Sequence, residues 1–321
     1  MHSFEQLSDS FAQHFSQVAF PGEPASLYDP NRYFLQLGGK RIRPVLCLMG
    51  NELFDEISKD AWQVGIAIEL FHNFTLVHDD IMDKAPLRRG MPTVHSKFGD
   101  STALLAGDVM LVMAYDHLVR ISGKYVFSIM SLFNRTARQV CEGQQMDMDF
   151  EKLTHISLEK YEQMISLKTS VLLACSLGMG AILGGAGERN QNLLYEFGRK
   201  LGLAFQVQDD YLDAFGNPEK FGKQVGGDIM ANKKTFLQVH AWEKASASQK
   251  EKLNQLAQSG EPGKVEEVLQ IYRDCQVDRW ASELKEIYLS QALQHLEDVA
   301  VLSKRKEPLK LLAAYLLQRD Y

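Results

Sequence analysis

The sequence predicts an all-α protein, a large helical bundle, and three observations carry that prediction. Only 9 of the 321 residues are proline, so long stretches contain no residue that breaks a helix. Apolar residues recur at helical spacing, beginning with Phe4, Leu7, Phe11 and Phe15, which lie three or four positions apart. No convincing run alternates apolar and polar residues as a half-buried strand does.

Local signals place the helices in order. The predicted ranges, good to a few residues, are about 4–18, 27–37, 43–55, 60–83, 101–121, 125–150, 157–183, 189–214, 233–247, 249–259, 263–276, 279–303 and 307–319. Asp60 is a candidate N-cap, and Ser248 with Glu251 forms a candidate capping box whose helix ends before Gly260. Two segments rich in glycine, proline and basic residues, 84–100 and 215–232, are expected to be loops.

Composition indicates one folded domain over residues 1–321. Hydrophobic residues make up 45% and charged residues 24%, with a mean hydropathy of −0.21, which excludes a disordered chain. No low-complexity tract or linker divides the sequence. A net charge of −6 and a pI near 5.9 argue against nucleic acid as a partner.

Cysteine use and hydropathy predict a cytoplasmic protein without a membrane-spanning segment. The four cysteines lie far apart with no CxxC pair, so we expect reduced, buried thiols. The most apolar window, residues 171–187, contains five glycines and two serines and is shorter than the ~20 apolar residues that a spanning helix needs. We therefore expect a buried, closely packed helix there.

Two clusters of aspartate are the most informative feature. Asp79, Asp80 and Asp83 lie in the octet LVHDDIMD, and Asp209 and Asp213 lie in the similar octet QVQDDYLD, each near the end of a predicted helix. Residues four apart on a helix are about 40° apart around its axis, so the outer carboxylates of each cluster share a face. A solvated helix end would explain one such cluster, but both follow apolar stretches.

Carboxylates stacked at the C-terminal end of a helix repel one another and oppose the helix dipole, so they call for a cation. Mg²⁺ suits oxygen ligands and completes its coordination with water and substrate phosphate. Cations that could hold such a phosphate surround the two clusters: Lys40, Arg43, Arg88, Arg89, Lys168, Lys223 and Lys233. His72, about two helical turns before Asp79, lies on the same face as that aspartate.

These motifs resemble those of the polyprenyl synthetase family, the trans-isoprenyl diphosphate synthases. The resemblance extends from Gly38 to about Lys233 and rests on GGKRIRP, HDDIMD followed by RRG, GQQMD, LKTS, FQVQDDYLD and a glycine-rich segment ending at Asp228. It implies the isoprenoid synthase type I fold, a helical bundle around a central cavity that the two aspartate motifs face. It also implies a homodimer and a short-chain geranylgeranyl or farnesyl diphosphate synthase.

The resemblance also implies a role for each matched residue. Lys40, Arg43, His72 and Arg89 would hold the diphosphate of isopentenyl diphosphate, and Arg88, Lys168, Lys223 and Lys233 that of the allylic substrate. Asp79, Asp83 and Asp209, supported by Asp80 and Asp213, would bind about three Mg²⁺ ions. Thr169 and Gln206 would place oxygen atoms near the developing allylic cation, with Gln144 and Asp147 behind them. The basic C-terminal tail of the family is reduced to Arg319.

Side chains before the first aspartate motif would set the length of the product. Phe74 and Phe71 precede Asp79 by five and eight residues, and Thr75 between them is small. The short-chain members of the family carry an aromatic residue at the Phe74 position, and C15 synthases often carry a second at the Thr75 position. The sequence therefore favours a C20 product, geranylgeranyl diphosphate, over C15. On an ideal helix Phe74 points about 140° away from Asp79 and Phe71 only about 80°, so either could be the floor of the cavity, or both could be core residues.

Two other functions remain open from the sequence. A class I terpene cyclase also uses DDxxD but pairs it with an Asn/Ser/Glu metal motif, and it would lack GGKRIRP. A non-catalytic subunit of a heteromeric prenyl synthase would usually have lost aspartates, whereas all six are present here.

Overall fold

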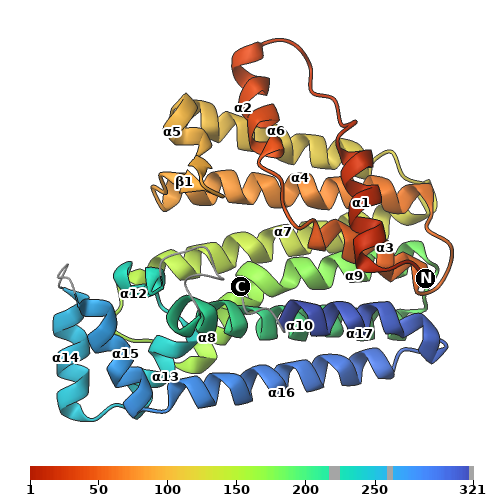
Figure 1. Cartoon of the computed structure of the whole chain (residues 1–321). Helices are drawn as coiled ribbons and strands as arrows, with labels where there is room; N and C mark the ends of the chain where they lie inside the picture. Colours follow the sequence, from red (N-terminus) through yellow and green to blue (C-terminus); the bar gives the residue numbers. More distant parts are fainter. Residues whose placement is uncertain (217–224, 259–262, 318–321) are drawn as a thin grey trace. The chain divides into compact units, whose positions relative to one another are not determined.

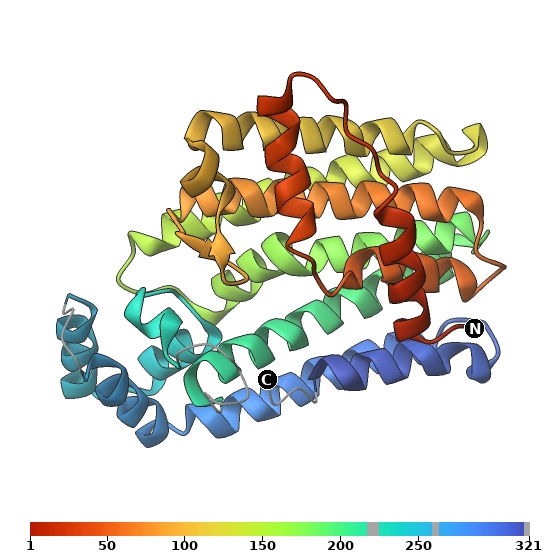
Figure 2. The same cartoon turned by 45° about the horizontal axis from the view of Figure 1, so that its top comes forward.

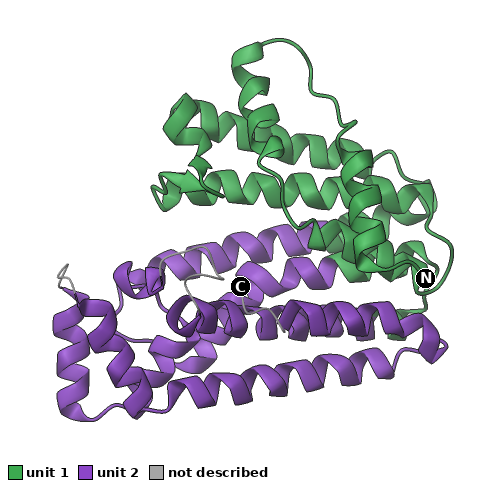
Figure 3. Ribbon diagram, viewed as in Figure 1, with its two compact units in different colours: residues 1–132, 176–191 green, residues 133–175, 192–321 purple. Residues whose placement is uncertain are grey.

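The computed structural model describes residues 1–216, 225–258 and 263–317. The chain divides into two compact units, coloured separately in Figure 3. Unit 1 consists of residues 1–132 and 176–191, and unit 2 of residues 133–175 and 192–321. The first aspartate motif belongs to unit 1 and the second to unit 2.

The all-α prediction is confirmed (Figure 1). The helices are α1 (Phe4–Phe15), α2 (Ala25–Gln36), α3 (Ile42–Glu52), α4 (Lys59–Met82), α5 (Val94–Phe98), α6 (Asp100–Leu118), α7 (Gly123–Glu151), α8 (Leu158–Ile165), α9 (Val171–Leu183), α10 (Glu188–Phe215), α12 (Gly227–Met230), α13 (Phe236–Lys244), α14 (Ala247–Ala257), α15 (Lys264–Asp274), α16 (Val277–Glu297) and α17 (Ser303–Leu317). A π-helical turn, η1 (Ser166–Ser170), joins α8 to α9.

Two predicted helix caps are wrong by two residues. Ser58, not Asp60, caps α4, because its hydroxyl accepts the N–H of Ala61 while Asp60 is already in the first turn. The capping box of α14 is formed by Ser246 and Gln249 rather than by Ser248 and Glu251. The Ser246 hydroxyl accepts the N–H of Gln249, and the Gln249 side chain accepts the N–H of Ser246. The predicted stop at Gly260 lies outside the described residues.

The segment predicted as a loop over 84–100 carries regular structure. Strands β1 (Leu87–Arg88) and β2 (Met91–Pro92) pair in antiparallel fashion, with Arg88 opposite Met91. Arg89 and Gly90 form the two-residue turn, and their φ angles of 53° and 76° are both positive, as in the turns that match the twist of a hairpin. The short helix α5 then leads into α6.

The core of unit 1 lies between α4 and α6, which run side by side in Figures 1 and 2 and make extensive contact. Buried Phe34, Val77, Val94, Ala103 and Met110 form one apolar cluster there, drawn from α2, α4, α5 and α6. The first aspartate motif ends α4, so this core fixes the position of the motif within the unit.

In unit 2 the second aspartate motif lies on α10, whose inward face is buried through Leu201, Leu203, Val207 and Leu212. Helix α13 packs against α8 and α16, and α15 packs against α12, α14 and α16. One helical stretch of the described chain, Leu158–Leu183, is long and apolar enough to cross a membrane. Of its most apolar window 72% is buried inside the protein, which is typical of a core helix.

The structure describes all four cysteines, and none forms a disulfide bond. The expectation that all are buried is wrong for two of them. Cys47 and Cys175 are buried, whereas Cys275 is half-buried and Cys141 is exposed on α7.

Candidate functional site

The first cluster of cations begins at a sharp corner of the backbone before α3. Gly38, Gly39 and Arg41 all have positive φ angles, 76°, 150° and 50°. A Cβ atom on Gly39 would lie 3.1 Å from the guanidinium of Arg89, so the missing side chain allows that group to approach the backbone. Arg41 forms an ion pair with Glu69, which is only 4% exposed and on α4. Lys40 is exposed at this corner.

Arg43 and His72 are two half-buried members of this cluster. Arg43 Nη1 lies 3.1 Å from His72 Nε2. A guanidinium can only donate, so Nε2 accepts and the ring proton of His72 is on Nδ1. Burial, followed by the charges of Arg43, Arg89, Arg88 and Arg41, holds the pKa of His72 well below its usual range, so the ring is neutral. Burial lowers the pKa of Arg43 to about 10, which leaves that group charged at neutral pH.

Arg88 and Arg89 are adjacent but contact different parts of unit 1. Arg88 is in strand β1, and its Nε donates to both carboxylate oxygens of Asp80 at 2.9 and 2.8 Å. Arg89 occupies the hairpin turn and reaches Gly39. Burial lowers the pKa of Arg89, and the neighbouring Arg41 and Arg88 lower it further. A non-glycine residue with a positive φ angle is strained, which is common at functional sites.

The first aspartate motif presents its carboxylates in three different environments. Asp80 is 1% exposed and paired with Arg88, so it orients that arginine directly. Asp79 is half-buried in the last turn of α4, and Asp83 is exposed at the C-cap, where its N–H donates to the carbonyl of Asp79. Asp79 and Asp83 are therefore the two carboxylates of the motif that are at least partly exposed at the C-terminal end of α4.

The second motif differs because its middle aspartate is a structural residue. Asp210 is 3% exposed and accepts hydrogen bonds from Gln206 Nε2 at 2.8 Å and from the N–H of Phe236 at 2.8 Å. Tyr161 Oη donates to it at 3.3 Å. Burial raises the pKa of Asp210 to about 8. Asp210 thus ties α8, α10 and α13 together.

The two outer aspartates of this motif are placed differently. Asp209 is exposed. Asp213 Oδ2 accepts the N–H of Asp228 at 3.0 Å, and its carbonyl accepts the N–H of Gly226 at 2.7 Å. Asp213 therefore holds the start of α12, where the glycine-rich segment ends.

Lys168 and Thr169 lie in the π-helical turn η1. Lys168 Nζ lies 2.6 Å from Asp147 Oδ2 on α7, where Gln144 is buried one turn earlier. Two glycines allow close packing here: a Cβ on Gly143 would lie 2.3 Å from the backbone nitrogen of Lys168, and one on Gly202 would lie 2.7 Å from Ser170 Cα. Such wide turns in a helix are frequent at functional sites.

The candidate chain-length residues lie on α4. Phe71 is 1% exposed, and its ring centroid lies 5.7 Å from that of half-buried Phe74. The Phe74 ring also contacts His78, with centroids 4.7 Å apart. The hydroxyl of Thr75 donates to the carbonyl of His72.

Some functional residues were missed or cannot be placed. Lys223 and Arg319 lie outside the described residues, and Lys233 is exposed with its N–H donating to the carbonyl of Asp228. Sequence reasoning missed Asp210 and Glu69, the buried carboxylates that position Gln206 and Arg41. A sequence signal existed for Glu69, which interrupts the apolar run from Gly65 to Phe71.

The donor chemistry fits Mg²⁺. Within the described ranges no three His, Cys, Asp or Glu side chains gather as a ready-made metal cage. Mg²⁺ does not require one, because it takes one or two carboxylates and completes its coordination with water and phosphate.

Arg43 Nε is buried and has no hydrogen-bond partner among the described residues, as expected of a group that receives an anion.

Comparison with known proteins gives a consistent result. The family model described as polyprenyl synthetase matches residues 24–275. A short-chain isoprenyl diphosphate synthase of Methanothermobacter thermautotrophicus is 36% identical over 93% of this chain and 92% of its own, and a geranylgeranyl diphosphate synthase of Methanosarcina mazei is 40% identical over 69% of each. The crystal structure of a geranylgeranyl pyrophosphate synthase superimposes with a TM-score of 0.94 at 42% identity, covering 99% of both chains. The chain therefore belongs to the polyprenyl synthetase family and is a prenyltransferase.

Proposed function

We propose that this protein condenses isopentenyl diphosphate head-to-tail with allylic diphosphates to make a short all-trans prenyl diphosphate, geranylgeranyl diphosphate. One observation carries the substrate class: the charges of four arginines, at positions 41, 43, 88 and 89, all lower the pKa of the neutral imidazole of His72. Such a concentration of guanidinium groups in a partly buried place favours a diphosphate, which arginine binds through two parallel hydrogen bonds.

In this proposal Lys40, Arg43, His72 and Arg89 bind isopentenyl diphosphate. His72 accepts from Arg43 and so fixes the direction of that guanidinium. The ring stays neutral and donates through Nδ1, adding no further charge beside four arginines. Arg88, oriented by Asp80, together with Lys168, Lys223 and Lys233, binds the allylic diphosphate.

Asp79, Asp83 and Asp209, supported by Asp80 and Asp213, are the proposed ligands of about three Mg²⁺ ions. Bound Mg²⁺ would supply Lewis-acid stabilisation of the negative charge that develops on the leaving diphosphate. Asp83 is exposed at the C-terminal end of α4 and Asp209 is exposed on α10, so both are accessible to a metal–diphosphate complex.

Side chains of the protein then stabilise the negative charge on the diphosphate and the positive charge on the allylic cation during the reaction. Arginine and lysine side chains stabilise the diphosphate as the bond to C1 of the allylic substrate breaks. The double bond of isopentenyl diphosphate attacks the resulting allylic cation, and the departing diphosphate takes the proton that is lost. Thr169 and Gln206 place oxygen lone pairs near the cation, and the hydrogen bond from Gln206 Nε2 to Asp210 fixes which way its amide oxygen points.

The decisive experiment is incubation with labelled isopentenyl diphosphate and each of the C5, C10 and C15 allylic primers, followed by analysis of product chain length. We expect elongation that stops at C20. Elongation that stops at C15 would assign the farnesyl synthase activity. Conversion of geranylgeranyl diphosphate alone, without isopentenyl diphosphate, would assign a terpene cyclase, and no turnover would assign a non-catalytic subunit.

We also propose a homodimer in the cytoplasm. Leu105 and Val112 on α6 and Val119 at its C-cap recur every seven residues and are 55%, 60% and 61% exposed, and Phe127 at the start of α7 is 84% exposed. These four residues define an apolar stripe that a second copy of the chain would cover. The cytoplasmic assignment is supported by four cysteines that form no disulfide bond in a structure that describes all of them.

A further inference from the structure

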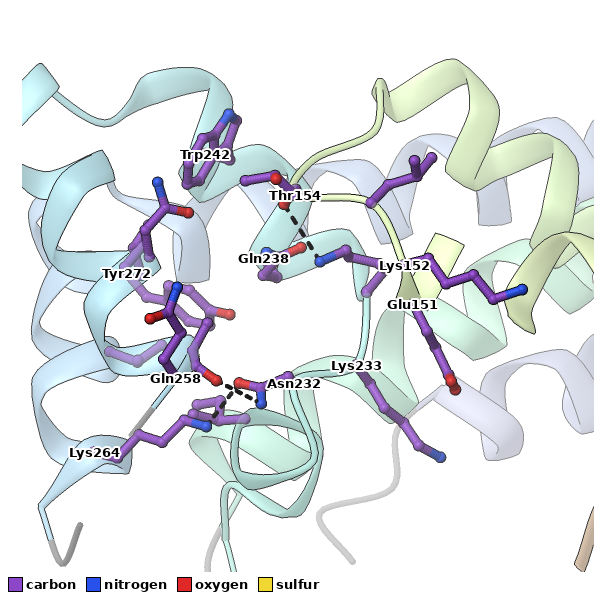
Figure 4. A pocket seen from close by; sticks show the side chains of 17 residues that line it. Glu151, Lys152, Thr154, Asn232, Lys233, Gln238, Trp242, Gln258, Lys264 and Tyr272 are labelled. Atoms are coloured by element: carbon purple, nitrogen blue, oxygen red, sulfur yellow. Dashed lines mark hydrogen bonds between the residues drawn. The ribbon is translucent and has the colours of Figure 1, made fainter. Parts of the chain in front are cut away.

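Unit 2 contains a cavity of about 310 Å³ formed by the end of α7, the α12–α13 connection and helices α13, α14 and α15 (Figure 4). That volume holds one small molecule. Trp242, Leu253 and Val268 give the cavity an apolar side, and Gln238 contributes an amide. Figure 4 shows Trp242, Tyr272 and Gln238 gathered together, whereas Lys152 and Lys233 extend away from them.

The cavity is strongly cationic. Among the described residues that line it, four are lysines and one, Glu151, is acidic. Lys264 is only 3% exposed, and its Nζ donates to Asn232 Oδ1 at 2.7 Å and to the carbonyl of Met230 at 3.4 Å. Lys234 Nζ donates to the carbonyl of Thr154 at 3.4 Å.

Both ammonium groups lie beside neutral oxygens, with Lys264 buried and Lys234 half-buried. Burial lowers the pKa of Lys234 and that of Lys264. A buried charge is costly unless an opposite charge or a full set of hydrogen bonds compensates it. An anion in the cavity would provide that compensation.

The cavity is connected to the second aspartate motif through one short segment. Residues 226–236 begin where Asp213 accepts the N–H groups of Gly226 and Asp228, and they end where Asp210 accepts the N–H of Phe236. From the middle of the segment, Ile229, Asn232, Lys233 and Lys234 line the cavity. A ligand that moves this lining therefore acts on the hydrogen bonds of both aspartates.

We propose that this cavity is a regulatory site for a small organic phosphate, with the phosphate on Lys234 and Lys264 and a short apolar group against Trp242. Occupancy reaches the second aspartate motif through residues 226–236. The site is distinct in composition from the arginine cluster of unit 1, so its ligand need not be a substrate.

Binding is tested in the full-length protein with 3-methylbutyl phosphate, which is a monophosphate and cannot react as an allylic substrate. The titration is followed by tryptophan fluorescence in EDTA, so that no metal site contributes. We expect a saturable change that Trp242→Phe abolishes and that 3-methylbutan-1-ol, which lacks the phosphate, does not produce. Lys234→Gln and Lys264→Met should each weaken binding by about tenfold or more, as expected for loss of a charged hydrogen bond.

Lys152→Gln is the matched control, because Lys152 borders the same cavity but pairs with Asp149 at 3.4 Å and extends away from Trp242. It should change affinity by less than about twofold. Arg89→Gln should leave the Trp242 response intact, because it alters only the arginine cluster of unit 1. A response lost in Arg89→Gln but kept in both Lys234→Gln and Lys264→Met would place the ligand at the arginine cluster and overturn the proposal.

Regulation is tested by steady-state kinetics with Mg²⁺ and saturating substrates. We expect 3-methylbutyl phosphate to change kcat in the wild type and in Lys152→Gln, and the concentration needed to rise by about tenfold in Lys264→Met. An effect that disappears at high isopentenyl diphosphate would indicate competition at the substrate site and overturn the regulatory role. Melting temperatures of the variants verify that each is folded.

Discussion

Burial and the charges of four arginines together keep the imidazole of His72 neutral in unit 1. The folded protein keeps the pKa of His72 well below 6.5, whereas the unfolded chain binds a proton there near its ordinary value. Below about pH 6.5 the unfolded state therefore binds more protons, and the free energy of unfolding falls as the pH falls.

This predicts a pH-dependent difference between the wild type and His72→Gln. Between pH 7.5 and 5.5 the wild type should lose about 1 kcal/mol more stability than the variant, since each pH unit below the unfolded pKa contributes at most about 1.4 kcal/mol. Urea unfolding of both proteins at the two pH values measures the two losses in unfolding free energy. Subtracting one loss from the other cancels the contributions of the other titrating groups. Equal losses in both proteins would mean that folding does not lower the pKa of His72.

Asp83 offers a test of the metal assignment. Asp83→Ala should lower kcat by at least about 100-fold, the usual cost of removing one preorganised electrostatic group. The folded protein should be no less stable, because a carboxylate at the C-terminal end of a helix opposes the dipole. Activity over a range of Mg²⁺ concentrations, together with thermal unfolding, checks both expectations.

Asp298→Ala is the matched control for this variant. Asp298 is also an exposed C-cap aspartate, at the end of α16, with nearly the same backbone conformation as Asp83. Its removal should give the same small change in stability with normal turnover. Normal turnover in Asp83→Ala as well would exclude Asp83 as a metal ligand.

At the scale of single elements, the contact between α7 and η1 depends on the absence of one side chain. Gly143→Ala would place a Cβ 2.3 Å from the backbone nitrogen of Lys168, so the backbone must move. We expect a loss of about 1–3 kcal/mol in unfolding free energy and a fall in kcat, because Lys168 and Thr169 move with that backbone. Gly123→Ala, at the open start of the same helix, should be stabilising by up to about 1 kcal/mol. Unchanged kcat in Gly143→Ala would separate η1 from catalysis.

Helix α4 carries the prediction about product length. Phe74 is half-buried and so retains surface that a growing chain can touch, whereas Phe71 is 1% exposed. Phe74→Ala should lengthen the product by at least one C5 unit, and Thr75→Phe should shorten it. Phe71→Ala should cost about 3–5 kcal/mol of stability and leave the product unchanged. Chromatography of the dephosphorylated products measures the length; a product set that none of these changes shifts would place the ruler on another helix.

Elements also show where sequence patterns reach their limit. Helix ranges follow from apolar spacing, which α1 obeys closely, but caps depend on which of several Ser, Thr and Asp side chains meets a backbone N–H. Ser58 and Asp60 both satisfy the composition rule, and only the backbone conformation chooses between them. The turn η1 has no local sequence signal, because the packing against Gly143 and Gly202 that accompanies it comes from distant segments.

On the scale of the whole molecule, the apolar stripe of α6 predicts assembly. Val112→Glu should convert a dimer to a monomer in sedimentation velocity, because two copies of the new charge would be buried near each other. Leu302→Glu is the control: Leu302 is 77% exposed but belongs to unit 2 and is not one of the residues of the stripe. A monomeric wild type, or a Val112→Glu variant that stays dimeric, would contradict the assignment.

The sequence indicates more of the candidate site than of the details of the fold, such as helix caps. The aspartates and arginines stand out because clustered like charge is costly unless a ligand compensates it. Asp210 and Glu69 were not foreseen as structural residues, because their roles depend on burial and on partners remote in sequence, such as Phe236 and Arg41. Sequence patterns identify charges but do not distinguish a carboxylate that binds a ligand from one that supports a neighbour.

The wide turn at η1 has a further consequence for how this helix tolerates change. The N–H of Val171 reaches back five residues to the carbonyl of Ser166, so the helical stretch carries one residue more than a regular α-helix needs. Each residue turns an α-helix by about 100°, and the surplus residue sets the rotational phase of everything that follows. Deleting any one residue within η1 would allow regular α-helical hydrogen bonds to form there. It would also rotate Lys168 away from its ion pair with Asp147, or Ser170 away from its contact with Gly202. The length of this segment is therefore under tighter constraint than its composition, and a deletion there is a harsher change than a substitution.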